Sequence, residues 1–119
     1  MDKVNLAEKF AKVSEHWSPK VVAALDDYEV KVVKLQGEFV WHSHDQEDEM
    51  FLVVEGNLTI RLRDRDIDLG AGELFVVPRG AEHQPVAEAE CRVLLIERKG
   101  VINTGDVEDA RTVRNLERI

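Results

Sequence analysis

Hydrophobic and polar residues change their spacing at Pro19. Before it, apolar residues recur every three or four positions, which predicts one helix over residues 5–16 that packs on the outside of the domain. This apolar stripe is Leu6, Phe10, Val13 and Trp17. Asn5 is suited to cap the helix, Glu8 completes a capping-box-like pair with it, and Ser18-Pro19 ends the helix.

After Pro19 the apolar residues form short runs or alternate with polar ones, as in strands. Leu58, Ile60 and Leu62 alternate with polar residues and predict a half-buried strand. Further runs predict strands near residues 21–25, 29–35, 50–54, 67–69, 74–77 and 91–97. Turn residues separate them, and no stretch between two strands has a helical pattern. The chain is therefore predicted to be all-β, a sandwich or barrel with a short N-terminal helix.

A chain of 119 residues is long enough for one domain with its own core. We expect an N-terminal helical arm at 1–19, a barrel at 20–98 and a C-terminal tail at 99–119. Hydrophobicity falls after Arg98 and the tail is charged. It is expected to be either loosely ordered or laid over a neighbouring molecule.

The net charge of −8 argues against nucleic acid or an anionic membrane as a partner, because phosphate binding needs clustered lysine and arginine. Cys91 is the single cysteine, so no intrachain disulfide forms, and its apolar surroundings predict a buried thiol. The first residues have no basic segment followed by an apolar one. No apolar run approaches membrane-spanning length. A cytoplasmic location is expected.

Three of the four histidines accompany a possible metal site. His42 and His44 are two apart, so in a strand both imidazoles project to one side. A short acidic loop follows, and Glu49 then begins an apolar run. Imidazole binds Zn, Cu, Fe and Ni, and carboxylate suits Mn. His16, near the end of the predicted helix, is interpreted as an ordinary surface histidine.

Two segments together resemble the paired motifs of the cupin superfamily, in its small single-domain form. The first is Gly37…His42-Ser43-His44…Glu49…Gly56 and the second is Gly72…Pro78-Arg79-Gly80…His83. The gap between Gly37 and His42 is one residue shorter than is usual in the family. The second motif normally ends in Asn, where this chain has Ala87.

This resemblance implies a double-stranded β-helix, or jelly-roll barrel, that binds one divalent transition metal ion (Fe, Mn, Zn or Ni). The implied ligands are His42, His44, Glu49 and His83. Four ligands on a six-coordinate ion leave two positions for water, a bidentate substrate, or substrate plus dioxygen. Glu47 and Asp48 are rival ligands, but are expected to form a solvated loop. A homodimer through the outer sheet is also implied.

Strand parity suggests which side chains face the metal. Phe51 shares a face with Glu49 and is a candidate pocket wall, while Met50, Leu52 and Val54 face the other way and need a cover. By the same parity, Val40 and Glu38 share the face of His42, and Phe39 and Trp41 point outward. Arg61 is expected to be a salt-bridged surface residue rather than a substrate ligand.

We therefore expect a metal-dependent enzyme acting on a small organic molecule, with dioxygenase or isomerase/epimerase-like chemistry. The alternative is a non-catalytic module that binds a metal and a small ligand, and a metal-free barrel is the third possibility. The sequence has no Ser-His-Asp, Cys-His or phosphate-loop motif that would favour another class of enzyme. The only other acid or base groups near the ligands are Glu38, Glu47 and Asp48, and the catalytic residues are unassigned.

Overall fold

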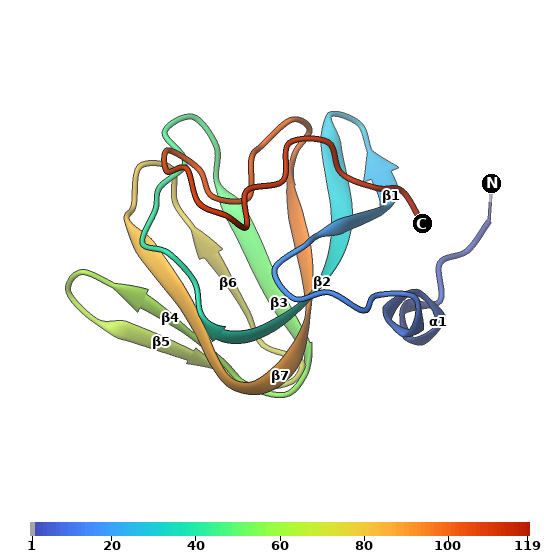
Figure 1. Ribbon diagram of the computed structural model, residues 1–119, viewed down its shortest axis with the longest axis horizontal. Coiled ribbons are helices and arrows are strands. Elements are labelled where there is room, and N and C mark those ends of the chain that lie inside the picture. Colours follow the sequence, from blue (N-terminus) through green and yellow to red (C-terminus); the bar gives the residue numbers. More distant parts are fainter. Residues whose placement is uncertain (1) are drawn as a thin grey trace.

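The structure is a computed structural model that describes residues 2–119 (Figure 1). One short helix precedes a set of antiparallel strands. The elements are α1 (Leu6–Ala11), β1 (Lys20–Leu25), β2 (Tyr28–Glu38), β3 (Glu49–Glu55), β4 (Leu58–Leu62), β5 (Asp66–Leu69), β6 (Leu74–Val77) and β7 (His83–Arg98). The all-β jelly-roll architecture with a short N-terminal helix, predicted from the sequence, is confirmed.

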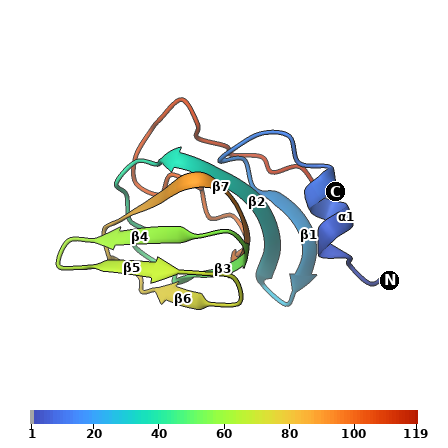
Figure 2. The same ribbon diagram turned by 90° about the horizontal axis from the view of Figure 1, so that it is seen from below.

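The long strand β7 joins the two halves of the barrel. Its C-terminal part lies between β2 and β3, within the strand order β1-β2-β7-β3-β6. Its N-terminal part pairs with β4, which in turn pairs with β5. Figure 2 shows the result, with β4 and β5 on one side of the molecule and β1 and β2 at the other. His83 is the first residue of β7, so the strand is longer than the sequence pattern indicated.

Side chains of β2, β3, β4 and β7 that point inward fill the barrel. In β3 the inward residues Glu49, Phe51 and Val53 are buried and alternate with half-buried ones, as the parity of the strand predicts. In β4, Leu58 and Ile60 are almost fully buried. Cys91 lies in the same core, where burial raises the pKa of its thiol to about 11 and keeps it protonated.

The helix is shorter than the apolar stripe suggested. Asn5 caps it as predicted, accepting a hydrogen bond from the Glu8 N–H at 3.0 Å, but the helix ends at Ala11. Phe10 and Val13 pack with Val32 on the outer face of β2. Trp17 does not continue this stripe. It has a φ of +61° and turns into the barrel core instead. The predicted helix of residues 5–16 is therefore wrong in its second half.

The C-terminal tail lies on its own barrel, across the end where the β2–β3 connection also runs (Figure 1). Asn103 and Arg111 hydrogen-bond to Trp17 and Glu38, and at the end of the chain Ile119 pairs with Val21 in β1. We expected a tail that is loosely ordered or laid over a neighbouring molecule, and the structure instead shows it bound to its own barrel. Within residues 2–119 no helix is long and apolar enough to cross a membrane.

Candidate metal centre

Backbone hydrogen bonds between two segments bring the metal-ligand candidates together. His42 and His83 form an isolated antiparallel bridge, although they are 41 positions apart in the chain. His44 follows in the same loop, and its carbonyl accepts a hydrogen bond from the N–H of Gly80, at 2.8 Å. Glu49 enters from the first position of β3, pointing inward. The four side chains therefore come from the β2–β3 loop and from two strands.

The four groups form a tight, buried cluster. One donor atom from each of His42, His44, Glu49 and His83 lies within 4.8 Å of the other three. The exposed fractions of these residues range from 0% for His83 to 6% for His44. Oε1 of Glu49 is 3.4 Å from Nε2 of His44 and 3.4 Å from Nε2 of His83. The four residues implied by the motifs thus converge on one point inside the barrel.

Main-chain carbonyls fix the orientation of two of the imidazoles. Nδ1 of His42 donates to the Val40 carbonyl at 2.9 Å, and Nδ1 of His83 donates to the Ala81 carbonyl at 3.0 Å. A carbonyl can only accept, so the proton of each neutral ring is on Nδ1. Nε2 of each ring is then a lone pair available to a metal, which is the usual supporting arrangement for a histidine ligand.

The electrostatics keep the carboxylate charged and His42 neutral. Burial opposes ionisation of Glu49, but its interactions with His44 and His83 hold the pKa of this carboxyl well below its usual value. Burial and the neighbouring His83 lower the pKa of His42 to about 4. For His44 burial also disfavours the charge, yet Glu49 outweighs it and raises the pKa of this imidazole. Protons therefore compete with a metal at His44.

The residues fit a transition metal ion. Nε2 of His44, Oε1 of Glu49 and Nε2 of His83 are buried and have no hydrogen-bond partner. Buried polar atoms left in this state are costly unless something binds them. A ligand sphere with bonds of about 2.1 Å places donor atoms about 3 to 4 Å apart, close to the observed spacing. Three imidazoles and one carboxylate suit Fe, Mn, Zn or Ni.

A second charged pair lies beside the cluster. Lys31 donates to Glu97 at 2.8 Å, and both side chains are only 1% exposed. Glu97 is the cross-strand partner of Glu49, and Oε2 of Glu97 has no hydrogen-bond partner. Burial, together with the charge of Glu49, raises the pKa of the Glu97 carboxyl well above its usual value. Sequence reasoning missed this pair because an inward Lys is not distinguishable from a surface one in a valine-rich strand.

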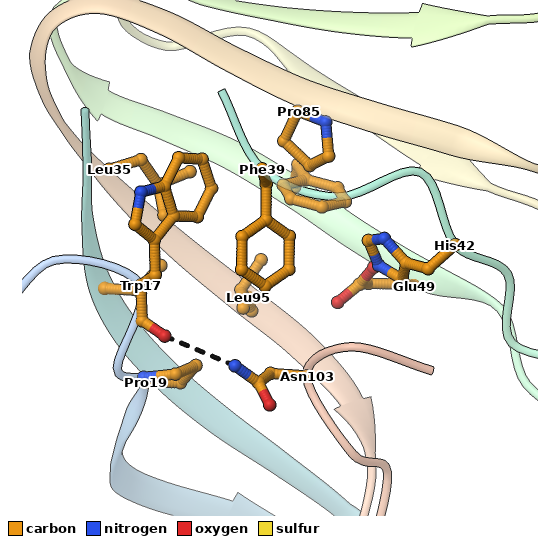
Figure 3. A pocket seen from close by; sticks show the side chains of 11 residues that line it. Trp17, Pro19, Leu35, Phe39, His42, Glu49, Pro85, Leu95 and Asn103 are labelled. Carbon is orange, nitrogen blue, oxygen red and sulfur yellow. Dashed lines mark hydrogen bonds between the residues drawn. The ribbon is translucent and has the colours of Figure 1, made fainter. Parts of the chain in front are cut away.

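A small apolar pocket, with a volume of about 30 Å³ and partly open to solvent, reaches the cluster at His42 and Glu49 (Figure 3). Its barrel wall consists of apolar residues of the strands and of the β2–β3 loop: Val33, Leu35, Phe39, Phe51, Pro85 and Leu95. The N-terminal arm adds Trp17 and Pro19, and the tail adds Asn103. Phe51 thus lies where strand parity predicted a pocket wall.

Parity gave the wrong direction for Phe39. This residue is 6% exposed, stacks on Trp17 with ring centroids 4.5 Å apart, and meets His42 edge-on at 5.5 Å. The reason is that β2 ends at Glu38, so alternation does not extend into the loop. Glu38 is exposed, although parity had placed it on the inner face with His42. Trp41 is half-buried, with the Arg63 guanidinium 3.8 Å from its ring.

The rival ligands do not join the cluster. Asp48 is exposed and accepts a hydrogen bond from the Arg79 N–H at 2.9 Å, which ties the acidic loop to the segment before β7. Glu47 is half-buried and is not among the residues whose donor atoms converge.

Arg61 is bound to Gln84 at 3.1 Å and does not line the pocket. His16 is exposed and pairs with Glu90.

The tail supports the histidine loop in a way that the sequence did not indicate. Asp106 accepts a hydrogen bond from the Ser43 N–H at 2.9 Å, and its own N–H donates to the Ser43 carbonyl at 3.1 Å. Gly105 has a φ of +57°, and a Cβ there would collide with the main-chain oxygen of Ser43. Ser43 separates the two loop histidines, so this contact holds the backbone that carries both of them.

Comparison with known proteins agrees with this geometry. A family model described as "Cupin domain" matches residues 29–97, more than half of the chain. The chain belongs to the cupin family. The cupin match covers all four candidate ligands, whereas Trp17, Asn103 and Asp106 lie outside it. The two terminal segments thus contribute to the pocket and hold the histidine loop from outside the matched cupin region.

Similar cupins include a structure of a cupin-2 domain containing protein from Shewanella frigidimarina. It is 49% identical, has a TM-score of 0.80, and the match covers 81% of this chain and 94% of that one. "Uncharacterized protein YdbB" of Bacillus subtilis is 29% identical over 80% of this chain and 85% of its own. A "3-hydroxyanthranilate 3,4-dioxygenase" of Xanthomonas euvesicatoria is 33% identical over 55% of this chain but only 39% of its own length.

Proposed function

We propose that this cupin is a metal-dependent oxygenase that acts on a small organic molecule. The proposal has two parts. His42, His44, Glu49 and His83 hold one divalent transition metal ion, and the apolar pocket holds the substrate against it. The orphaned donor atoms of the cluster support the first part, and the position of His42 and Glu49 in the pocket wall supports the second.

The observation that carries the choice of reaction is the chemistry of the pocket wall. Apart from His42 and Glu49, the described lining residues are apolar, with the amide of Asn103 as the one exception. An isomerase or epimerase needs a positioned acid or base to move a proton between carbons. The lining offers none that is not already a proposed ligand. Glu38 and Asp48 are exposed, so neither takes this role.

Oxygenase chemistry needs less from the protein. The bound ion would supply a site where dioxygen and an electron-rich substrate meet, and the chain would bind, orient and exclude water. The carbonyl-bound Nδ1 atoms of His42 and His83 hold the two rings in place. Phe51, Leu95 and Phe39 provide the dry wall. The similarity to a protein named as a dioxygenase supports the same choice.

The experiment is an oxygen-electrode screen of protein loaded in turn with Fe, Mn, Ni or Zn. We expect oxygen uptake with Fe, Mn or Ni and at least one catechol or β-diketone, and none with redox-inactive Zn. His83→Ala removes a proposed ligand and should abolish the uptake, whereas His16→Ala, at an exposed histidine away from the cluster, should not. Turnover with Zn, or isomerisation without oxygen uptake, would overturn the proposal.

A non-catalytic binding module remains the second candidate, and the deep burial of the cluster favours it over an open enzyme site. It predicts stoichiometric metal and ligand binding with no oxygen uptake for any metal. A cytoplasmic site of action belongs to the proposal for either candidate, because the single cysteine is a buried free thiol and no disulfide stabilises the described chain.

A further inference from the structure

The pocket beside His42 and Glu49 has no room for an organic molecule. Its volume of about 30 Å³ is enough for about two water molecules. The exposed fractions of the four proposed ligands do not exceed 6%. A small organic molecule needs several times this volume. The pocket must therefore widen before such a molecule reaches the cluster.

Part of the C-terminal tail forms a wall of both hollows that reach the cluster. In the small pocket this wall contains Asn103 (Figure 3). A second hollow, of about 220 Å³, lies between the histidine loop and the tail. His44 is the proposed ligand in its wall, and residues 100–102, 105 and 106 form its tail side. We call residues 101–113 the strap. Movement of the strap changes both hollows at once.

The strap is held together by its own hydrogen bonds. Asn103 Nδ2 donates to the Arg111 carbonyl, and Asn103 Oδ1 accepts from the Val113 N–H, both at 2.9 Å. The hydroxyls of Thr104 and Thr112 lie 2.7 Å apart, and Thr104 is fully buried although the strap lies on the surface. None of these bonds involves the barrel. They stay intact if the strap moves as one unit.

Polar contacts hold the strap on the barrel. They join Asp106 to Ser43, Arg111 to the carbonyl of Glu38, and Asn103 to the carbonyl of Trp17. The apolar residues of the strap are half-buried, and in the described chain none of them belongs to a hydrophobic core cluster: Val101, Ile102, Val107 and Val113. The net contribution of a hydrogen bond is small where water can replace the partner. Releasing the strap therefore costs much less than unfolding the barrel.

Both ends of the strap are anchored on the sheet. Before it, the N–H of Lys99 donates to the Asp27 carbonyl at 2.8 Å, and Gly100 follows with a φ of +90°. After it, the last residues of the chain pair with Val21 in β1, and Ile119 packs against the apolar cluster under the helix. A segment that is fixed at both ends and held by few contacts between them is a unit that opens locally.

From these observations we infer that the strap is a gate over the metal cluster. When it is seated, as in the structure, it leaves room only for water beside His42 and Glu49. When it lifts, the end of the barrel opens to an organic molecule, and the rate of lifting limits how fast that molecule binds. The inference rests on the proposed function for the metal ion and the organic molecule, but the lifting is measurable without either.

Hydrogen exchange of the metal-free, full-length chain, followed by NMR, tests the lifting. The N–H groups of Ser43 and Asp106 lose their partners when the strap lifts, whereas those of Val21 and Lys99 belong to the anchors. We expect the first two amides to share one protection factor, at least about tenfold below the protection factors of the last two. Equal protection of all four amides would overturn the gate.

Arg111→Gln removes the contact between the strap and the Glu38 carbonyl. Arg114→Gln is the matched control, because Arg114 pairs with a carboxylate of the tail itself. Protection of the two strap amides should fall about tenfold in Arg111→Gln and stay unchanged in the control. Amides in the middle of β7 should keep their protection in both variants. An equal fall in β7 would contradict the gate, and if Arg111→Gln does not fold, the wild-type comparison decides.

Binding kinetics test the gate at the site. The chain loaded with Co(II) is mixed under nitrogen with acetohydroxamate, a bidentate organic chelator, and the visible absorption of the cobalt is followed by stopped flow. The observed rate should level off at high probe concentration, because opening limits it. The plateau should be about tenfold higher in Arg111→Gln and unchanged in Arg114→Gln. A rate that rises linearly with concentration and is the same in both variants would overturn gated access.

The gate and the metal site can fail separately. The expected exchange pattern in a chain that binds no cobalt would contradict the metal site and leave the lifting of the strap standing. Stoichiometric cobalt binding in a chain whose Ser43 and Asp106 amides are as protected as the anchors would do the opposite.

Discussion

The main-chain N–H of His42 donates to the carbonyl of His83 at 3.0 Å, and the N–H of His83 donates back to the carbonyl of His42 at 2.9 Å. This pair of hydrogen bonds joins the β2–β3 loop to the first residue of β7. It places two imidazoles side by side with ring centroids 4.2 Å apart. The proposed metal centre therefore rests on a backbone contact between the two segments that carry His42 and His83.

The tail contact at Ser43 should matter for metal affinity. Asp106→Ala removes the acceptor of the Ser43 N–H and loosens the loop that carries His42 and His44. Loss of such supporting contacts typically weakens metal binding about 10- to 100-fold. Competition with a chromogenic chelator measures the change. Asp109→Ala, at a tail carboxylate that binds Arg111 rather than the loop, is the control, and an equal loss in both variants would contradict this role.

The buried Lys31–Glu97 pair predicts strongly non-additive stability. Lys31→Met leaves Glu97 buried without its partner and should lower the free energy of unfolding by about 3 to 5 kcal/mol. Adding Glu97→Leu removes the stranded carboxyl and should restore most of that loss. Urea unfolding of the metal-free single and double variants measures both changes. A double variant less stable than the Lys31→Met single variant would show that the pair is not coupled in this way.

Metal affinity should rise with pH. Glu49 raises the pKa of His44 in the metal-free protein, so a metal must displace a proton from His44 at pH values below that raised pKa. His42, with a pKa of about 4, is already neutral there and releases none. Calorimetric titration from roughly pH 5.5 to pH 7.5 should show affinity increasing by up to about tenfold per pH unit. A flat profile over this range would be inconsistent with proton competition at His44.

The outer face of the barrel supports the proposed homodimer. Val76, Met50 and Ile96 form one cross-strand row of outward apolar residues, and Leu74, Leu52 and Leu94 form the next. Val76 and Leu74 are 46% and 55% exposed, and they lie on β6 at the end of the strand order. Two copies that cover this face would remove it from water.

Light scattering after gel filtration tests this pairing. The wild-type chain should have twice the mass of 13.5 kDa, and Leu74→Lys with Val76→Glu should give a monomer. Thr59→Lys with Asp68→Lys, on β4 and β5, is the control and should leave the mass unchanged. A monomeric wild-type chain at micromolar concentration would rule the pairing out.

The sequence predicted the barrel and the ligand set because both depend on regular features. Inward positions of β3 and β4 alternate strictly, and the spacing from His42 to Glu49 and on to His83 follows the cupin motifs. The convergence of His42 and His44 was predicted from the alternation of side chains along a strand. That reason does not apply, because these residues lie in a loop rather than in a regular strand. The backbone contacts with His83 and Asp106 direct them instead.

The part of the pocket that Trp17, Phe39 and Asn103 line could not be predicted from the sequence. The spacing of Trp17 fits the apolar stripe of a helix, but the helix ends six residues earlier, at Ala11. Trp17 itself has a positive φ, so the chain turns there. Phe39 was assigned outward because alternation was carried past the end of β2. The tail binds the barrel through hydrogen bonds of Asn103, Asp106 and Arg111. Such contacts produce no periodic pattern of hydrophobic residues in the sequence. These contacts join segments distant in sequence, and local pattern does not encode them.

We propose that four residues far apart in the chain hold one metal ion. Elemental analysis of protein purified without chelator, reconstituted with Fe, Mn, Ni or Zn and desalted, is the decisive measurement. We expect one ion per chain for the wild type and for His16→Ala, and a loss of at least about tenfold in affinity for His42→Ala and for His83→Ala. A folded wild-type chain that retains none of these ions, or a His83→Ala variant that binds them as tightly, would contradict it.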